Sequence, residues 1–395
     1  MNKLRVGVLF GGRSGEHEVS LLSAASVIEA IDKSKYEVVP IGITKQGRWV
    51  TAAHAERLLQ GKHESERHLR AGDPAATGPA AVLAKGEGII VPPEPLTQEK
   101  QPLAPFEESA AEGGRATHAI AVDVIFPVLH GTFGEDGTIQ GLLELADLAY
   151  VGAGVLGSAC GMDKDVMKRL FAAARLPMVK HVTVLRSEWE RGPKAVRRAI
   201  EKKLRYPVFV KPANLGSSVG ISKVHGGREL AAAMDDAGAY DRKIIVEQGV
   251  GGNQGKAREI ECSVLGNDQP QASVAGEVVP CKEFYDYAAK YLEEGSELHI
   301  PARITKAQQK KVQELAVAAF RAVECEGLAR VDFLMDPRSG KIYVNEINTM
   351  PGFTSISMYP KLWAASGISY PQLIDRLIQL GLERHAEKKK NKYSR

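Results

Sequence analysis

Two acids and an amide in a predicted β-hairpin are the side chains of this sequence best suited to hold a metal ion. The stretch ARVDFLMDPRSGKIYVNEIN (residues 329–348) has two runs of strand-forming residues around the turn signal DPRSG. Side chains alternate along a strand, so Arg330 and Asp332 share one face of the first strand. For the same reason Glu346 and Asn348 share one face of the second strand.

The pairing of the two strands decides whether these oxygens meet. If the loop comprises residues 337–341, Asp332 lies opposite Glu346, and Arg330 lies opposite Asn348. Opposed carboxylates repel each other, and a hard divalent cation removes that repulsion and prefers oxygen ligands. A loop one residue shorter would destroy this register. The solvent-facing side of an ordinary edge hairpin would show the same alternation, so the hairpin alone leaves both interpretations open.

A second candidate site is a turn of small residues between two predicted strands. The stretch YPVFVKPANLGSSVGISKV (206–224) carries Lys211 at the end of the first strand, just before the turn. Because a strand and not a helix follows, this is no Walker P-loop. Backbone N–H groups and hydroxyls of such a turn can still bind phosphate oxygens, and Lys211 adds a positive charge. An ordinary flexible turn is the alternative interpretation.

A competing function rests on GAGVLG, residues 152–157, which matches the pattern G-x-G-x-x-G after a predicted short strand. A dinucleotide site requires an acid about 20 residues further on. The corresponding stretch, LPMVKHVTV (176–184), contains none. We therefore interpret GAGVLG as a packing turn at a domain junction, in which Gly154 is expected to need a positive φ. The alternative is a nicotinamide-dependent oxidoreductase.

Composition places the chain among globular proteins of two or three domains, since its 395 residues are 44% apolar and 25% charged. The net charge of +4 is small and predicts no nucleic-acid surface. No apolar run is long enough to span a membrane, and we find no signal peptide. The four cysteines form no CxxC pair, which favours reduced thiols in the cytoplasm. Histidine spacing gives no zinc motif.

The elements that must position these groups fall into three units. The first opens as βαβ, which predicts an open α/β sheet; its elements are 4–10, 18–31, 37–43, 119–129, 138–146 and 149–151. Residues 57–117 interrupt it as a surface insertion with one short strand, 88–91. The second unit has a helix at 164–174 and strands at 182–185, 208–212, 221–224 and 244–247. The third has strands at 259–265 and 274–279, a helix at 306–323, the hairpin 329–347 and a helix at 371–380.

Seven motifs, in this order and spacing, closely resemble D-alanine–D-alanine ligases of the ATP-grasp superfamily. They are GGRSGEHEVS (11–20), HGTFGEDG (130–137), MDK (162–164), VKPANLGSSVG (210–220), FYDYAAKY (284–291), ARVDF (329–333) and NEINTMPGFTSIS (345–357). The match runs from about residue 4 to 382. The chain departs from the family in its insertion, its basic tail and Ala288, where many relatives carry Glu.

The resemblance implies an ATP-grasp fold, with α/β and α+β parts and a Rossmann-like N-terminal domain. The expected division is a first domain at 1–152, a central subdomain at 153–247 and a C-terminal subdomain at 248–382. Residues 383–395 are expected to form a disordered basic tail.

The resemblance also implies site residues. Those expected to bind ATP are Lys164, Lys211, Gly216, Ser217, Ser218, Val219, Gly220, Glu247, Glu259 and Lys290. Those expected to hold two Mg²⁺ (or Mn²⁺) ions are Asp332, Glu346 and Asn348. Those expected to act on the amino acids are Glu16, Ser217, Tyr291, Arg330, Gly352 and Ser357. His130 is expected either near the first substrate or in a structural role, and Asp163 as a helix cap.

The implied reaction joins two D-alanines through a D-alanyl phosphate, giving ADP, phosphate and the dipeptide for peptidoglycan synthesis. Tyr291, in a predicted lid, is expected to hydrogen-bond to Ser217, which in turn links to Glu16. A tyrosine at this position is typical of relatives that form the dipeptide and not an ester. The family also implies a cytoplasmic homodimer whose partners are small molecules, not nucleic acid or membrane. A non-catalytic ATP-grasp binding protein remains the third candidate, beside the oxidoreductase.

Overall fold

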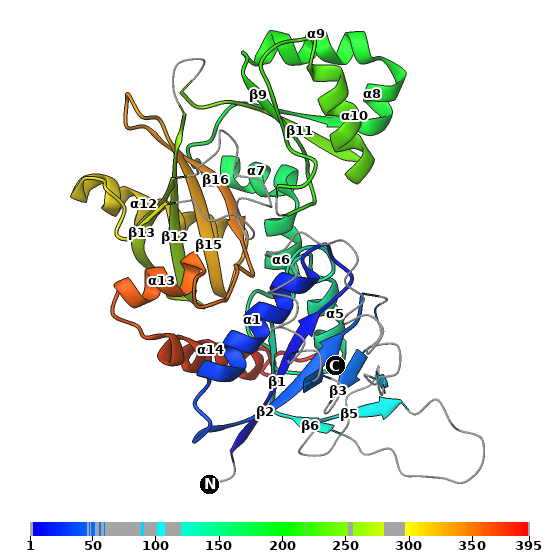
Figure 1. The fold of residues 1–395 in the computed structure, drawn as a ribbon, viewed down its shortest axis with the longest axis vertical. Coiled ribbons are helices and arrows are strands. Elements are labelled where there is room, and N and C mark those ends of the chain that lie inside the picture. Colours follow the sequence, from blue (N-terminus) through cyan, green and yellow to red (C-terminus); the bar gives the residue numbers. More distant parts are fainter. Residues whose placement is uncertain are drawn as a thin grey trace, which may run out of the picture.

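The computed structural model describes residues 3–45, 47, 49–51, 55–56, 59, 88–90, 101–106, 120–216, 218–251, 256–279 and 297–393. Figure 1 shows a lower part built on β1 and β2, a middle part built on the broad sheet β12–β16, and an upper part carrying α8, α9 and α10. No helix within these residues is both long and apolar enough to cross a membrane.

The first sheet has the strand order β3-β2-β1-β7. It comprises β1 (Leu4–Gly11), β2 (Tyr36–Ile43), β3 (Trp49–Thr51) and β7 (Val124–Pro127), with α1 (His17–Ala30) and α5 (Thr138–Leu145). Strands β2 and β7 both run parallel to β1, so the predicted βαβ opening is confirmed. Most of β1 is buried, as expected for a parallel strand covered on both faces.

The insertion contains more structure than the single strand that we expected. Within it, β4 (Gly88–Ile90) pairs with β5 (Gln101–Phe106), and β5 pairs with β6 (Ile120–Val122), which lies in the predicted stretch 119–129; the three form a small antiparallel sheet. The predicted strand at 88–91 is confirmed, but our expectation that the insertion holds only this one strand was wrong. Prolines at positions 102 and 105 explain the error, because proline normally argues against a central strand. Most of 57–117 lies outside the described residues.

The second sheet has the order β10-β9-β11-β8 and is antiparallel. Its strands, β8 (His181–Leu185), β9 (Val208–Pro212), β10 (Ser222–Val224) and β11 (Lys243–Gln248), confirm the four predicted ones. Helices α8 (Arg186–Arg191), α9 (Pro193–Lys203) and α10 (Leu230–Tyr240), which we did not predict, share a separate hydrophobic core with these strands. The glycine loop therefore joins two paired strands, β9 and β10.

The third sheet has the order β14-β13-β12-β15-β16. Its strands are β12 (Arg258–Gly266), β13 (Gln271–Val279), β14 (Glu297–His299), β15 (Gly327–Met335) and β16 (Ile342–Asn348), and α12 (Lys306–Ala322) packs on it. Helix α7 (Lys164–Ala173) buries Met167 and Phe171 in this same core, although its sequence position puts it in the second unit.

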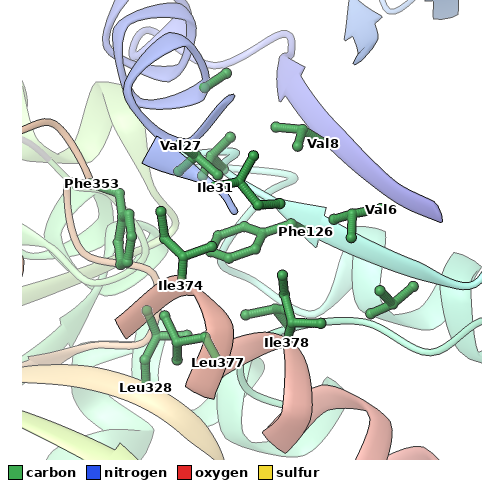
Figure 2. Close-up of a cluster of buried hydrophobic side chains, with 14 of the residues drawn as sticks. Val6, Val8, Val27, Ile31, Phe126, Leu328, Phe353, Ile374, Leu377 and Ile378 are labelled. Carbon is green, nitrogen blue, oxygen red and sulfur yellow. The ribbon is translucent and has the colours of Figure 1, made fainter. Parts of the chain in front are cut away.

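The C-terminal helix α14 (Tyr370–Lys388) belongs to the core of the first domain. Its residues Ile374, Leu377 and Ile378 lie among Val6 and Phe126 of the first sheet (Figure 2). Helix α13 (Met358–Ala365) precedes it. The chain therefore returns to its beginning, and the middle and lower parts share one apolar interface.

The expected end of this helix and the expected disordered tail need correction. Helix α14 continues through residues 383–388. Arg384 lies 4.0 Å from the ring centre of Tyr150 and donates to the carbonyl of Gly152. His385 contacts Asp147 at 2.9 Å, and Lys388 pairs with Glu144. These contacts hold the basic end of the helix against α5 and the segment that follows it, so the positive charges there are paired within the fold.

The GAGVLG segment forms the start of helix α6 (Val155–Met162). The positive φ that we expected at Gly154 was wrong: Gly154 has φ −70°, and Gly152 has φ 100°. Gly157 is needed for close packing, because an added Cβ there would lie 2.6 Å from the carbonyl oxygen of Glu324. The segment thus serves helix packing, as interpreted.

We predict that Gly157→Ala destabilises the protein. Alanine in a helix is intrinsically better than glycine by about 1 kcal/mol, but the clash with a backbone carbonyl should outweigh this gain. The expected net loss in the free energy of unfolding is about 1–3 kcal/mol. Gly141→Ala in α5 is the matched control, because no atom lies within 4 Å of its added Cβ. Urea denaturation measures both, and equal stabilities for the two variants would contradict the packing role.

Candidate active site

The hairpin β15–β16 brings the predicted oxygen ligands together, although its turn differs from the expected one. Asp332 pairs with Glu346, and Arg330 pairs with Asn348, as predicted. At the turn, however, Met335 and not Asp336 pairs with Ile342, so the loop is one residue longer. A bulge between the two regions, at Asn345, restores the register.

The bulge also turns Glu346 away from the core. Ile342 and Val344 are buried, so strict alternation would bury the next even position, Glu346. With the extra residue, Ile347 is buried instead, and Glu346 is partly exposed on the other face. In the β16 sequence IYVNEIN, the buried apolar residues change from even positions (Ile342, Val344) to an odd one (Ile347), and the bulge accounts for this change.

Two adjoining pockets meet at this face of the hairpin. The inner pocket encloses about 80 Å³ and is lined by residues of the first domain, the glycine loop and the segment after β16, among them Glu16, His130, Glu135, Lys164, Gly216 and Gly352. The cleft encloses about 190 Å³ between the second and third sheets; among its lining residues are Lys211, Glu247, Glu259, Glu261, Asp332 and Leu334. Ser218, Ile221, Arg330 and Glu346 line both spaces.

The glycine loop forms the wall between the two pockets. Gly220 has φ 67°, and Ser218 has φ 60°, a left-handed conformation that suits a tight turn. The amide of Val219 donates to the carbonyl of Gly216 at 3.3 Å, and the Val219 side chain is 37% exposed. Lys164, the first residue of α7, donates to the carbonyl of Leu215 at 2.7 Å. Its ammonium thus lies beside the loop and 3.9 Å from Glu346.

Two buried lysines share the carboxylate of Glu247. Lys211 on β9 approaches one oxygen at 2.7 Å, and Lys168 on α7 approaches the other at 2.7 Å. Burial alone would raise the pKa of Glu247, but the two lysines hold it down at about 2. Both oxygens of Glu247 are therefore committed to lysines, and the side chain fixes the position of Lys211.

Glu16 and His130 both line the inner pocket. Glu16 immediately precedes α1 and makes no side-chain cap, so its carboxylate is directed to the pocket that it lines. His130 is buried between Ser23, at 2.9 Å, and the carbonyl of Met350, at 3.1 Å. Burial opposes protonation of His130, but Glu135 and Glu16 raise its pKa overall. These bonds favour a structural role for His130, which supports the segment before Gly352.

Arg330 is held between two acids. Its guanidinium donates to both oxygens of Asp332, at 2.6 and 2.7 Å, and lies 3.0 Å from Glu261 on the neighbouring strand β12. Asn348 donates to the same Asp332 at 3.2 Å. Because Arg330 lines both pockets, this arrangement fixes a cation at their junction.

Of the remaining predicted residues, two make local hydrogen bonds and three lie outside the described part. Ser357 precedes α13, and its hydroxyl accepts from the amide of Thr354 at 3.0 Å. Asp163 caps α7 by accepting from Asp165 and Val166, as predicted. The predictions for Ser217, Lys290 and Tyr291 fall outside the described residues.

Sequence reasoning missed three charged residues of the site. Glu135 lines the inner pocket, Glu261 lines the cleft, and Lys168 is buried behind the cleft. A signal for Lys168 was present, because it follows Lys164 by four positions and so lies on the same face of the helix. Glu135, in the loop before α5, and Glu261, on β12 beside β15, become recognisable only when segments far apart in the chain are placed together.

Comparisons with known proteins agree over nearly the whole chain. Profiles of families described as "D-ala D-ala ligase N-terminus" and "D-ala D-ala ligase C-terminus" match residues 5–153 and 170–379. A curated D-alanine–D-alanine ligase of Heliobacterium modesticaldum is 50% identical over 99% of this chain and 98% of its own length. One from Thermoanaerobacter sp. is 51% identical over 98% of this chain and 99% of its own.

Solved structures show the same relationship. The D-alanine–D-alanine ligase from Coxiella burnetii superposes with a TM-score of 0.79 at 35% identity, covering 99% of this chain and 97% of its own. The VanG D-Ala:D-Ser ligase from Enterococcus faecalis gives 0.78 at 36% identity, covering 96% of this chain and 100% of its own. With this ATP-grasp fold and these matches, the chain belongs to the D-alanine–D-alanine ligase family.

Proposed function

We propose that the cleft holds ATP and the inner pocket holds the first D-alanine, as two halves of the active site of an ATP-dependent D-alanine–D-alanine ligase. The observation that carries this assignment is their shared wall, where Ser218, Ile221, Arg330 and Glu346 face both spaces. Group transfer requires the two reactants in contact, and a shared wall provides one place where a γ-phosphoryl group and a carboxylate can meet. The nicotinamide reading of GAGVLG is abandoned with the family assignment.

In the first step, the carboxylate of D-alanine attacks the γ-phosphorus of ATP, and ADP leaves. Lys164, which lines the inner pocket, and Lys211, which lines the cleft, would stabilise the negative charge that moves between the phosphates. The backbone amides of the loop Gly216–Gly220, including those of Ser218 and Val219, would direct further N–H dipoles toward the same phosphates. Glu259 on β12 lines the cleft and would contact the adenosine, while Glu247 acts chiefly by holding Lys211.

In the second step, the neutral amine of another D-alanine attacks the acyl phosphate, and phosphate leaves. A tetrahedral oxyanion forms on the acyl carbon. Arg330 and the backbone N–H of Gly352 are the donors proposed to stabilise it. Because Asp332 and Glu261 restrain Arg330, its guanidinium is oriented before the oxyanion develops, which lowers the reorganisation needed.

The substrate ends would be fixed by residues of the first domain and of α13. Glu16 would bind the ammonium of the first D-alanine, and Ser357 the carboxylate of the second. Helix α1 begins next to Glu16, and its free N–H groups favour a carboxylate by about 0.3–1 kcal/mol when exposed. Ser217, Lys290 and Tyr291 keep their proposed roles, Lys290 at ATP and Tyr291 as the lid contact to Ser217.

Asp332, Glu346 and Asn348 are proposed to hold two Mg²⁺ (or Mn²⁺) ions. The donor set supports this, since two opposed carboxylates and an amide oxygen are hard ligands on one strand face. Among the described residues no three acids, histidines or cysteines converge, so the phosphates would complete the coordination. Such ions would neutralise the charge of the phosphates. Asp332 would have to exchange part of its contact with Arg330.

Three expectations from the family complete the proposal. The division at 1–152, 153–247 and 248–382 is supported by the separate sheets of the three parts, with α7 packing across the second boundary. The enzyme would act in the cytoplasm, supplying the dipeptide for peptidoglycan precursors. It would function as a homodimer.

We predict that D-alanine, and not L-alanine, triggers phosphate release from ATP. The inner pocket is lined by acids, lysine and backbone groups from several segments, and separate contacts to the carboxylate, the ammonium and the side chain would hold only one enantiomer. Phosphate release is measured with Mg²⁺ and each enantiomer at the same concentration. Equal rates with the two enantiomers would refute the substrate assignment.

We predict that Glu346→Gln raises the Mg²⁺ concentration for half-maximal activity by about tenfold or more. The amide keeps the size of the side chain but removes the charge opposite Asp332. Glu314→Gln, an exposed residue of α12, is the control and should leave the titration unchanged. An unaltered titration for Glu346→Gln would exclude this residue as a ligand.

A further inference from the structure

Lys168 is a buried charge that the reaction does not touch. Its side chain is 0% exposed and lies on α7, one turn after Lys164. The neighbouring Met167 and Phe171 fill the hydrophobic core. An apolar side chain at position 168 would suit this environment better, because burying an ammonium costs several kcal/mol and a buried ion pair seldom repays that in stability. The lysine therefore needs a functional explanation.

The contacts of Lys168 link the three parts of the cleft. Its ammonium lies 2.7 Å from Glu247 at the end of β11, and it donates to the carbonyl of Asn345, the bulge residue of β16, at 3.3 Å. Glu247 in turn holds Lys211 at 2.7 Å. One side chain of α7 is thus joined to the second sheet through an ion pair and to the third sheet through the bulge next to Glu346.

The charge of this cluster depends on Lys168. Two ammonium groups and one carboxylate leave one net positive charge at Lys168, Glu247 and Lys211. Without Lys168, Glu247 would neutralise Lys211 completely, and the cleft would offer ATP an ion pair in place of a cation. Glu247 would still have a partner, so the fold would not be left with an isolated buried acid.

We propose that Lys168 is a positioning residue that occupies Glu247 and so leaves Lys211 with positive charge for the phosphates of ATP. This inference rests on the proposed function, because it assumes that the cleft binds ATP. It assigns Glu247 to a lysine–acid–lysine cluster and gives a reason for the second buried lysine. Lys168 itself contacts neither substrate.

The test compares Lys168→Met with the parent enzyme. Dissociation constants for ATP and for adenosine come from titration calorimetry, and steady-state kinetics give KM and kcat. We expect ATP binding about tenfold weaker or more, since bonds to charged groups account for such factors. Adenosine binding and the KM for D-alanine should change less than about twofold, because neither depends on the charge beside the phosphates. Arg169→Met, whose side chain is exposed on the same helix, should behave as the parent.

A second variant separates charge from packing. Lys168→Met combined with Glu247→Gln removes the neutralising acid but keeps an amide oxygen at position 247 that still accepts from Lys211, so this double variant should bind ATP more tightly than Lys168→Met and approach the parent. A folded Lys168→Met that binds ATP like the parent would overturn the inference. So would a folded double variant that binds ATP about tenfold more weakly than the parent. This second comparison decides the question even if Lys168→Met fails to fold.

The kinetics also distinguish this inference from the proposed function. A parent enzyme that releases no phosphate with D-alanine would refute the function itself. If the parent enzyme releases phosphate with D-alanine and the Lys168→Met variant binds ATP with unchanged affinity, only the role of Lys168 is refuted. Equal losses for ATP and adenosine would likewise count against it, because a general distortion of the cleft would affect both ligands.

Discussion

The placement of helix α7 is the constraint on which the site depends. One face of the helix buries Met167 and Phe171 in the core of the third sheet, and this fixes where that face points. That face carries Lys164 and Lys168, one turn apart, toward the glycine loop and Glu247. Apolar packing thereby determines where two ammonium groups lie, although those groups themselves oppose burial. The attraction between lysines and acids then draws the second sheet against the third.

The hairpin β15–β16 shows how a local irregularity changes which residues face the cleft. Its bulge places Glu346 on the face that carries Asp332, while Ile347 returns to the core. A regular hairpin with the observed turn would have put the carboxylate into the hydrophobic core, where an isolated charge is very costly. Burial of Ile347 and exposure of Glu346 favour the same bulged register, so packing and chemistry agree at this position.

The C-terminal helix joins the ends of the chain. Its apolar residues complete the core of the first domain, next to Val6 and Phe126 (Figure 2). Its charged end is bound to Tyr150, Asp147 and Glu144. The first domain carries Glu16, and the third sheet carries Arg330, so this helix helps to hold the residues proposed to bind the substrate and the oxyanion at a fixed separation. The distance between Glu16 and Arg330 therefore depends on contacts between distant parts of the chain, which local sequence patterns do not encode.

The sequence by itself determined the class of fold, the strands and helices with strong periodicity, and the ordered motifs of the family. These features depend on neighbouring residues, as in the alternation around Asp332 or the small residues of the loop after Lys211. Tertiary structure decided the rest. The bulge at Asn345, the packing of α7 on the third sheet and the cluster at Lys168 depend on contacts between segments far apart in the chain. The spacing from Lys164 places Lys168 on the same helix face, but it does not show that Lys168 is buried, because burial depends on which acid and which core the folded chain brings to it.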